Sequence, residues 1–232
     1  MLKLLALDTS ADACSVALLD GSELSGHFRV EPRGHTRLIM PMVRQLLDEQ
    51  GVALADLDAL AFAAGPGSFT GLRIATGVIQ GLAWGLDIPV VPVSSLQSVA
   101  LAVAEGQGAQ EGDGIAVAFD ARMDEVYWGC YRHTAGLPEP LAPERVCPPE
   151  QVSLPEGPLR WLAGGSGWRY AERMPDEVVN RVGSPELDMI PDARFVVRLA
   201  ADAWKKGAAV PAADAQPVYL RDEVTWKKLP GR

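Results

Sequence analysis

An alternation of strand-like and helical segments between residues 57 and 105 constrains the fold of this chain more than any other feature. Apolar runs cover Leu57 to Ala63 and Ile88 to Val93, and helical segments cover Ser68 to Leu86 and Ser95 to Glu105. Consecutive parallel strands need a crossover between them, and such crossovers are right-handed in almost all proteins. The alternation therefore predicts an α/β protein with parallel strands at its centre.

The residues before this unit predict an antiparallel extension of the same sheet. Apolar runs at Leu4 to Asp8 and Cys14 to Leu19 are separated by turn residues, and a third strand is expected over Glu23 to Val30. Apolar residues then recur with helical period over Thr36 to Gln50, and Gly51 follows at the position of a C-terminal cap. We expect a mixed sheet flanked by helices.

A second lobe is expected after the segment Gly106 to Gly114, which is rich in glycine and polar residues. Strands at Ile115 to Phe119 and Val126 to Tyr131 flank a charged turn, much as strands do at the N-terminus. We therefore divide the chain into an N-terminal lobe, residues 1–106, and a C-terminal lobe, residues 107–232. The C-terminal lobe should also contain a helix over Phe195 to Lys206, with Asp192 as its N-terminal cap, and an extended tail over Val218 to Trp226.

The composition favours a folded globular protein. Hydrophobic residues form 48% and charged residues 22% of the 232 residues, close to the globular average. Lysine and arginine total 21 against 30 acidic residues, so the net charge of −9 should repel nucleic-acid phosphates on average. The three cysteines are far apart, and no apolar run reaches the ~18 residues of a membrane span. We expect a cytoplasmic protein that makes no membrane contact.

A glycine-rich turn, Gly65 to Gly71, lies between an expected buried strand and an expected helix. Backbone N–H groups at such a place can hold an anion, which is one interpretation of the turn. The glycine spacing matches neither the nucleotide P-loop nor the dinucleotide fingerprint. The other interpretation, which we favour, is a tight turn in which Ser68 or Thr70 caps the helix.

The helix after this turn carries three glycines at intervals of four residues, Gly77, Gly81 and Gly85, and a further glycine, Gly71, near its start. Gly71, Gly77, Gly81 and Gly85 leave one face with little side chain, although each glycine costs a helix about 1 kcal/mol relative to alanine. Close approach of another element would account for them. That element is either the protein's own sheet or, as we slightly prefer, a helix of another subunit.

Candidate ligands for a metal ion are sparse. The three histidines, His27, His35 and His133, lack the spacing of three or four that places two imidazoles on one helical face. Asp8 and Asp120, each at the end of an expected strand, form the most suggestive carboxylate pair, although both are common turn residues. We predict no metal site in this chain.

Four segments together resemble one known family. They read LALDTS from Leu5, GPGSFTGLR from Gly65, FDARMDEVYWGCY from Phe119 and YLRDEVTWKKLPGR from Tyr219. These motifs, spread over almost the whole chain, are similar to those of the bacterial TsaB family, also called YeaZ. The resemblance implies an actin-like, sugar-kinase-like fold of two lobes, each with a mixed sheet flanked by helices.

The resemblance also implies a role in making threonylcarbamoyladenosine beside the anticodon of tRNAs that read codons beginning with adenine. In that system the related protein TsaD transfers the threonylcarbamoyl group and holds a metal through a His-x-x-x-His motif. The corresponding helix here reads His35-Thr36-Arg37-Leu38-Ile39, without the second histidine. This resemblance implies a non-catalytic scaffold that binds and activates TsaD, with no cofactor of its own, while ATP and a metal are used by the partners.

The expected partners follow from the same resemblance. They are TsaD in a heterodimer, the ATPase TsaE in a ternary complex, a second copy of the chain, and tRNA indirectly. The first two helices would form the interface, through Leu38, Met42, Leu46, Thr70, Arg73, Ile74, Gly77, Gln80 and Gly81. A candidate nucleotide or phosphate cleft consists of Asp8, Thr9, Ser10 and Asp120.

Two other functions remain open from the residues. One is an enzyme acting alone, a metallopeptidase or a nucleotide hydrolase, based on Asp8, Asp120 and the glycine-rich turn. The other is a self-contained homodimer with a regulatory binding role.

Overall fold

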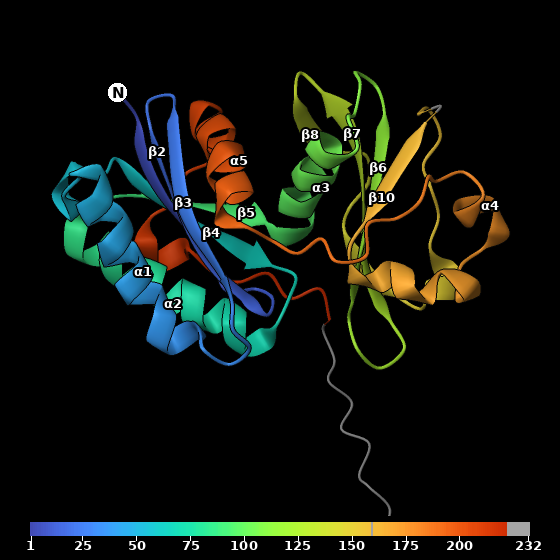
Figure 1. Ribbon diagram of the computed structural model, residues 1–232, viewed down its shortest axis with the longest axis horizontal. Coiled ribbons are helices and arrows are strands. Elements are labelled where there is room, and N and C mark those ends of the chain that lie inside the picture. Colours follow the sequence, from blue (N-terminus) through green and yellow to red (C-terminus); the bar gives the residue numbers. More distant parts are fainter. Residues whose placement is uncertain (159, 222–232) are drawn as a thin grey trace, which may run out of the picture.

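Two five-stranded sheets form the framework of the computed structural model in Figure 1, which describes residues 1–158 and 160–221. The strands of the first sheet are β1 (Lys3–Asp8), β2 (Ala13–Asp20), β3 (Glu23–Val30), β4 (Ala59–Gly65) and β5 (Val90–Ser94). Those of the second are β6 (Gly114–Asp120), β7 (Val126–Thr134), β8 (Leu137–Pro140), β9 (Arg145–Cys147) and β10 (Trp161–Gly164). The helices are α1 (His35–Gln50), α2 (Phe69–Leu86), α3 (Ser95–Gly106), α4 (Asp176–Val179) and α5 (Ala193–Lys205).

The first sheet has the mixed topology that the sequence predicts. Its order is β3-β2-β1-β4-β5, in which the pairs β1–β2 and β2–β3 are antiparallel and the pairs β1–β4 and β4–β5 are parallel. The second sheet is also mixed, because β6 pairs antiparallel with β7 and parallel with β10. The prediction of an α/β fold with two mixed sheets and flanking helices is confirmed.

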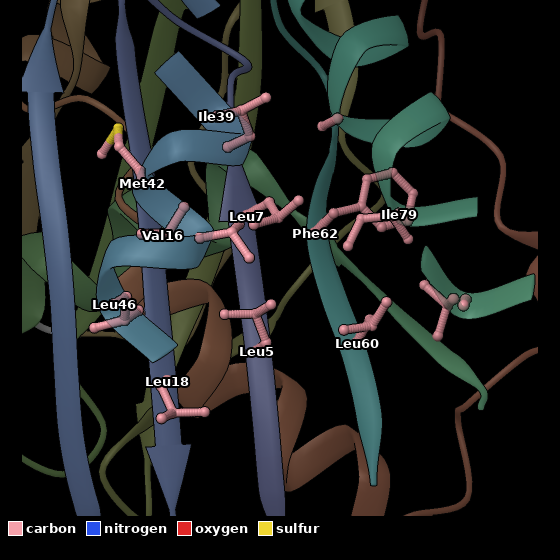
Figure 2. Packing of buried hydrophobic residues seen from close by; sticks show 14 of the residues in the cluster. Leu5, Leu7, Val16, Leu18, Ile39, Met42, Leu46, Leu60, Phe62 and Ile79 are labelled. Atoms are coloured by element: carbon pink, nitrogen blue, oxygen red, sulfur yellow. The ribbon is translucent and has the colours of Figure 1, made fainter. Parts of the chain in front are cut away.

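Helix α1 covers one face of the first sheet through side chains that recur every three or four residues. Figure 2 shows Ile39, Met42 and Leu46 of α1 in one packed group with Val16 and Leu18 of β2. Each fully buried side chain of this size stabilises the fold by about 1.5–3 kcal/mol relative to exposure. The helix ends at Gly51, whose φ of 64° is the left-handed conformation that glycine adopts readily, as predicted for a C-terminal cap.

The last helix, α5, packs where the sequence did not predict it. We placed it in the C-terminal lobe, but Val196, Val197 and Ala200 of α5 lie in one buried cluster with Leu4 and Ala61 of the first sheet. It therefore covers the face of the first sheet opposite α1 and α2. The prediction that Asp192 caps this helix is confirmed, since its Oδ1 accepts from the backbone N–H of Arg194 at 2.8 Å.

Helix α3 belongs by packing to the second sheet. Leu96, Val99 and Val103 share a buried cluster with Ile115 and Val117 of β6, although the sequence places this helix in the first lobe. Figure 1 shows α3 and α5 side by side between the two sheets. The boundary between residues 106 and 107 separates the strands of the first sheet from those of the second. That the two parts are separate domains stays a prediction.

Of the predicted extended tail, Val218 to Trp226, residues 222–226 lie outside the described part of the chain. The described part runs along the first lobe, where the Val218 N–H donates to the Ala64 carbonyl oxygen at 2.7 Å. It then reaches the second lobe, where Arg221 pairs with Glu125. The final segment, as described up to Arg221, thus contacts both lobes.

Candidate functional site

The glycine-rich turn is folded tightly against the loop that follows β1. The Ser68 N–H donates to the Ser10 carbonyl oxygen at 2.7 Å, and Ser68 Oγ accepts from the Gly71 N–H at 3.3 Å. A Cβ at Gly67 would lie 2.5 Å from the Ser10 oxygen, and one at Gly71 would collide with the Thr9 carbonyl oxygen. The backbone of the β1 loop therefore occupies the space beside the turn, and the prediction of Ser68 as helix cap is confirmed.

Gly71 therefore does not belong to an outward glycine stripe. It is buried, and its lack of a side chain allows the start of α2 to approach the β1 loop. The Thr9 hydroxyl donates to the Gly71 carbonyl oxygen at 2.7 Å and closes this contact. The sequence analysis placed Gly71 on one open face with Gly77, Gly81 and Gly85, and that grouping is wrong.

Asp8 is a buried carboxyl group at the end of β1. Its Oδ1 accepts from the backbone N–H and the hydroxyl of Ser10, both at 2.7 Å. Its Oδ2 has no hydrogen-bond partner among the residues described. Burial raises the pKa of this carboxyl group to about 7, the Ser10 hydrogen bonds oppose the increase, and the nearby Asp192 adds to it. Asp8 can therefore exchange a proton near neutral pH.

Asp120, the other carboxylate of the candidate cleft, has partners of its own in the second lobe. Its Oδ1 accepts from the Arg122 N–H at 2.8 Å and from the Tyr170 hydroxyl at 3.4 Å. In the part of the chain that the structure describes, Asp8 and Asp120 share no hydrogen-bond partner. Within residues 1–158 and 160–221, no three histidine, cysteine or acidic side chains are grouped so that they could hold a metal ion.

The three histidines take part in separate local contacts. His27 pairs with Glu49, His35 contacts the Ala11 carbonyl oxygen at 2.8 Å, and His133 contacts the Gln110 carbonyl oxygen at 3.1 Å. These contacts give each imidazole a role in the local structure.

The outward face of α2 is the part of the candidate interface that solvent reaches. Thr70, Arg73, Gly77 and Gly81 are exposed, whereas Ile74 and Gln80 are partly buried. A Cβ built at Gly77, Gly81 or Gly85 would meet no described atom within 4 Å. Packing against the protein's own sheet, one of the two origins we considered for these glycines, is therefore excluded.

Three predicted interface residues on α1 lie instead in the core. Leu38, Met42 and Leu46 are only 7%, 3% and 1% exposed and pack against the first sheet. Their helical period marks an apolar face but does not distinguish a partner from the chain's own sheet. These three assignments are corrected, and the solvent-facing side of α1 consists of other residues, among them Arg44 and Gln45.

Sequence reasoning missed the aromatic residues on and beside α2. Phe69 is 56% and Trp84 is 74% exposed, and Tyr219 stacks on Phe69 at a centroid distance of 5.4 Å. The Arg73 guanidinium lies 4.0 Å from the centroid of Phe69, and its Nε donates to the Tyr219 hydroxyl at 3.3 Å. Phe69 precedes Arg73 and Gly77 at the same interval of four, a signal that could have placed it on this face.

A groove of about 480 Å³ runs beside this face, between α2 and the final segment. It is lined by Arg73, Thr76, Gly77, Gln80, Gln216, Pro217 and Tyr219. Gln80 Nε2 donates to the Ala215 carbonyl oxygen at 2.9 Å and fixes the final segment along the helix. An arginine, two aromatic rings and open glycines next to a groove are features of a protein-binding surface.

The fold and this surface define the class of protein. Two mixed sheets flanked by helices, with α3 and α5 between them, form the actin-like, sugar-kinase-like fold. No helix in the described residues has the length and apolar character needed to cross a bilayer. The site is a solvent-facing helix with an adjacent groove.

Comparisons with known proteins identify the family. A family model described as "TsaD: tRNA N6-adenosine threonylcarbamoyltransferase" matches residues 29–176. The chain is 39% identical to the Escherichia coli (strain K12) tRNA threonylcarbamoyladenosine biosynthesis protein TsaB, over 100% of both chains. The Haemophilus influenzae protein of that name is 38% identical over 100% of this chain and 98% of its own.

A solved structure agrees with these relatives. YeaZ from Pseudomonas aeruginosa has a TM-score of 0.89 and 48% identity, and the match covers 95% of this chain and 100% of that one. A second structure from that organism, described as similar to peptidase YeaZ, has a TM-score of 0.90. The chain belongs to the TsaB (YeaZ) family.

Proposed function

We propose that this chain is an accessory subunit of tRNA threonylcarbamoyladenosine synthesis that binds TsaD through the outward face of α2. It activates TsaD for threonylcarbamoyl transfer to the adenosine beside the anticodon of tRNAs that read codons beginning with adenine. The relatives' role in this biosynthesis supports the proposal. The observation that carries it is the open glycine face at Gly77, Gly81 and Gly85.

The energetic argument starts from the cost of these glycines. Each glycine costs the isolated helix about 1 kcal/mol relative to alanine, and no contact among the described residues compensates for it at these three positions. A partner helix could approach the α2 backbone closely here, because no Cβ separates the two. Phe69 and Trp84 then provide the large aromatic side chains that dominate the binding energy of many interfaces.

The scaffold role leaves the catalytic chemistry to the partner. We infer that TsaD supplies the metal and the transfer reaction, that the ATPase TsaE joins the complex, and that tRNA is contacted through the assembly. The net charge of −9 supports indirect rather than autonomous contact with tRNA. This role would be carried out in the cytoplasm and needs no cofactor in this chain.

A bulky substitution on α2 tests the interface. In a titration of TsaD against the purified chain, Gly77→Phe should weaken binding about a hundredfold, because the ring fills the space needed by the partner backbone. Gly183→Phe is the matched control, since Gly183 is also exposed and has no positive φ. Equal affinities for wild type and Gly77→Phe would overturn the proposed surface.

A second measurement tests the role itself. Depletion of the chain, followed by mass analysis of tRNA nucleosides, should show loss of threonylcarbamoyladenosine. Complementation with Gly77→Phe should restore less of the modified nucleoside than complementation with Gly183→Phe. Normal levels after depletion would exclude the function in tRNA modification.

The alternative of an enzyme acting alone draws on one observation, the buried carboxyl group of Asp8 with a pKa raised to about 7. Together with Thr9, Ser10 and Asp120 it would contribute to a nucleotide or phosphate cleft. Hydrolysis of ATP or peptide by the purified chain, lost in Asp8→Asn, would favour this alternative.

A homodimer through the outward face of α2 is the other alternative. Light scattering with and without TsaD distinguishes this homodimer from the heterodimer.

A further inference from the structure

The final segment of the described chain, residues 215–221, has a fitted place on the first lobe. The Val218 N–H donates to the Ala64 carbonyl oxygen near the end of β4 at 2.7 Å. The next residue, Gly65, has a φ of 122°, and a Cβ built there would lie 2.6 Å from the Val218 carbonyl oxygen. A side chain at this position would displace the segment, because glycine alone allows two backbones to approach so closely. The first glycine of the glycine-rich turn therefore makes room for the final segment.

The last described residue, Arg221, is anchored on the turn between β6 and β7 in the second lobe. Its guanidinium pairs with Glu125, and its side chain is largely buried, at 17% exposed. The guanidinium also donates to the Arg122 carbonyl oxygen at 3.4 Å and to Met123 Sδ at 3.7 Å. Arg122, Met123 and Asp124 have positive φ values of 62°, 54° and 60°, a backbone that residues other than glycine adopt rarely. Arg221 thus holds the final segment on a turn of defined shape.

Tyr219 lies between these two places and touches the outward face of α2. Its ring stacks on Phe69 with the two centroids 5.4 Å apart, and its hydroxyl accepts from Arg73 Nε at 3.3 Å. The Arg73 guanidinium lies 4.0 Å from the Phe69 centroid, so the three exposed side chains form one group. Exposed side chains lose rotamer freedom when a partner binds, unless neighbours already hold them in the bound orientation. Tyr219 supplies such a neighbour to Phe69 and Arg73.

We propose that Tyr219 and Arg221 are positioning residues for the binding surface on α2. Arg221 holds the end of the final segment on the second lobe through its pair with Glu125, and this keeps Tyr219 on α2. Tyr219 in turn keeps Phe69 and Arg73 in the orientation that the partner binds. Contiguous contacts of this kind carry coupling between distant positions. Affinity at α2 therefore depends on an ion pair in the other lobe.

Release of the end of the final segment should weaken binding more than folding. Of residues 215–221, only Ala215 belongs to a buried hydrophobic cluster, whereas Val218 and Tyr219 are exposed. Separation of Arg221 from Glu125 opens no part of that cluster. Each side chain that must be ordered anew at binding lowers the affinity, and three such side chains together lower it about tenfold or more.

Charge exchange tests the ion pair on the full chain. In a titration with TsaD, Arg221→Glu should raise the dissociation constant about tenfold, because Glu125 repels the new carboxylate and the segment is released. The double variant Arg221→Glu with Glu125→Arg should restore wild-type affinity, since the pair is recreated with reversed sign. Arg169→Glu is the matched control and should leave the affinity unchanged, because it breaks an exposed pair of the same lobe, with Asp188. If the double variant binds as weakly as Arg221→Glu, Arg221 acts on TsaD directly and the inference is overturned.

A double-mutant cycle tests whether Arg221 acts through Tyr219. Tyr219→Ala should weaken TsaD binding about tenfold on its own. In the Tyr219→Ala background, Arg221→Glu should change the dissociation constant by less than about twofold, because the side chain that Arg221 positions is absent. A role of Arg221 that is independent of Tyr219 predicts instead that the two effects multiply, and that result would overturn the inference.

Hydrogen exchange of the Val218 amide reports the position of the final segment without any partner. The hydrogen bond to Ala64 protects this amide in wild type. Arg221→Glu should raise the exchange rate at Val218 about tenfold or more and leave the amides of β1 unchanged, whereas Arg169→Glu should change neither. Unchanged exchange at Val218 in Arg221→Glu would contradict the inference, because the segment would then be held without the ion pair.

The inference rests on the proposed function, since it takes TsaD as the occupant of the α2 face, and the two can fail separately. Weaker binding of Gly77→Phe together with wild-type binding of Arg221→Glu would overturn this inference alone. Equal affinities of wild type and Gly77→Phe would instead overturn the proposed surface, and with it the role of Tyr219 at that surface.

Discussion

At the scale of single residues, Asp8 links burial to a pH dependence. Its carboxyl group has a pKa of about 7 in the folded chain, against 3.8 as the reference value. The folded state therefore keeps a proton that the unfolded state has lost, and stability must fall as pH rises from about 4 to about 7. Above that window both states are ionised and the loss is complete.

Replacing Asp8 by asparagine should remove this dependence. The amide oxygen can still accept from Ser10, but the side chain no longer ionises. Between about pH 5 and about pH 8 wild type should lose about 2–3 kcal/mol of unfolding free energy relative to Asp8→Asn. Urea unfolding at the two pH values measures the difference. If the difference in unfolding free energy between wild type and Asp8→Asn were the same at both pH values, Asp8 would be ionised throughout this range in the folded chain.

Two glycines of α2 should respond in opposite directions to the same substitution. Gly77→Ala should stabilise the isolated chain by about 0.5–1 kcal/mol, because its Cβ meets open space and alanine favours the helix. Gly71→Ala should destabilise it, because its Cβ collides with the Thr9 carbonyl oxygen. Urea midpoints of both variants check the signs. A destabilised Gly77→Ala would show that something within the chain packs on this face.

At the scale of elements, the apolar residues of α1 belong to the core of the chain and not to the proposed interface. Met42→Ala should cost about 2–5 kcal/mol of unfolding free energy, since the side chain is packed between α1 and the sheet. The exposed Gln45, one turn further on, is the matched control, and Gln45→Ala should change stability by less than about 0.5 kcal/mol. The dissociation constant for TsaD, measured on the folded fraction of Met42→Ala, should equal that of wild type. A specific loss of affinity would restore Met42 to the interface.

Local patterns predicted the elements themselves well. Helical periodicity predicts α1, and Gly51 predicts its C-terminal cap. Ser68 and Asp192 are predicted as N-terminal caps, because short side chains that carry an oxygen accept from the first backbone N–H groups of a helix. The candidate site was predicted only in part. Periodicity reveals that Met42 is on an apolar face, but which surface covers that face depends on tertiary packing.

At the scale of the whole molecule, sequence order did not predict which sheet each helix covers. Helix α5 follows the second sheet in the chain but packs on the first, and α3 precedes the second sheet but packs on it. No local pattern encodes such a return of the chain, because the apolar faces of both helices would suit either sheet. Each of these two helices therefore follows the strands of one sheet in the sequence and packs on the other sheet, or precedes the sheet on which it packs, so that α3 and α5 connect the two lobes.

A half-buried glutamate, Glu144, strengthens this connection between the lobes. Glu144 lies in the second lobe and accepts two hydrogen bonds. One comes from the hydroxyl of Ser94, the last residue of β5 and the N-terminal cap of α3. The other comes from the Tyr131 hydroxyl of β7 at 2.5 Å. Burial raises the pKa of Glu144, opposed by the Ser94 and Tyr131 hydrogen bonds. The carboxyl group thus ties the end of a first-sheet strand to the middle of the second sheet.

Removing this group should weaken the molecule as a whole. Glu144→Ala leaves the buried Tyr131 hydroxyl without its acceptor and should cost about 1–3 kcal/mol of unfolding free energy, whereas Glu139→Ala, at an exposed position, should cost less than about 0.5 kcal/mol. In a Tyr131→Phe background the cost of Glu144→Ala should become smaller, because no donor is left unpaired there. Chemical denaturation of the four chains of this cycle measures the coupling. Additive costs would mean that Glu144 stabilises the lobe contact through Ser94 alone.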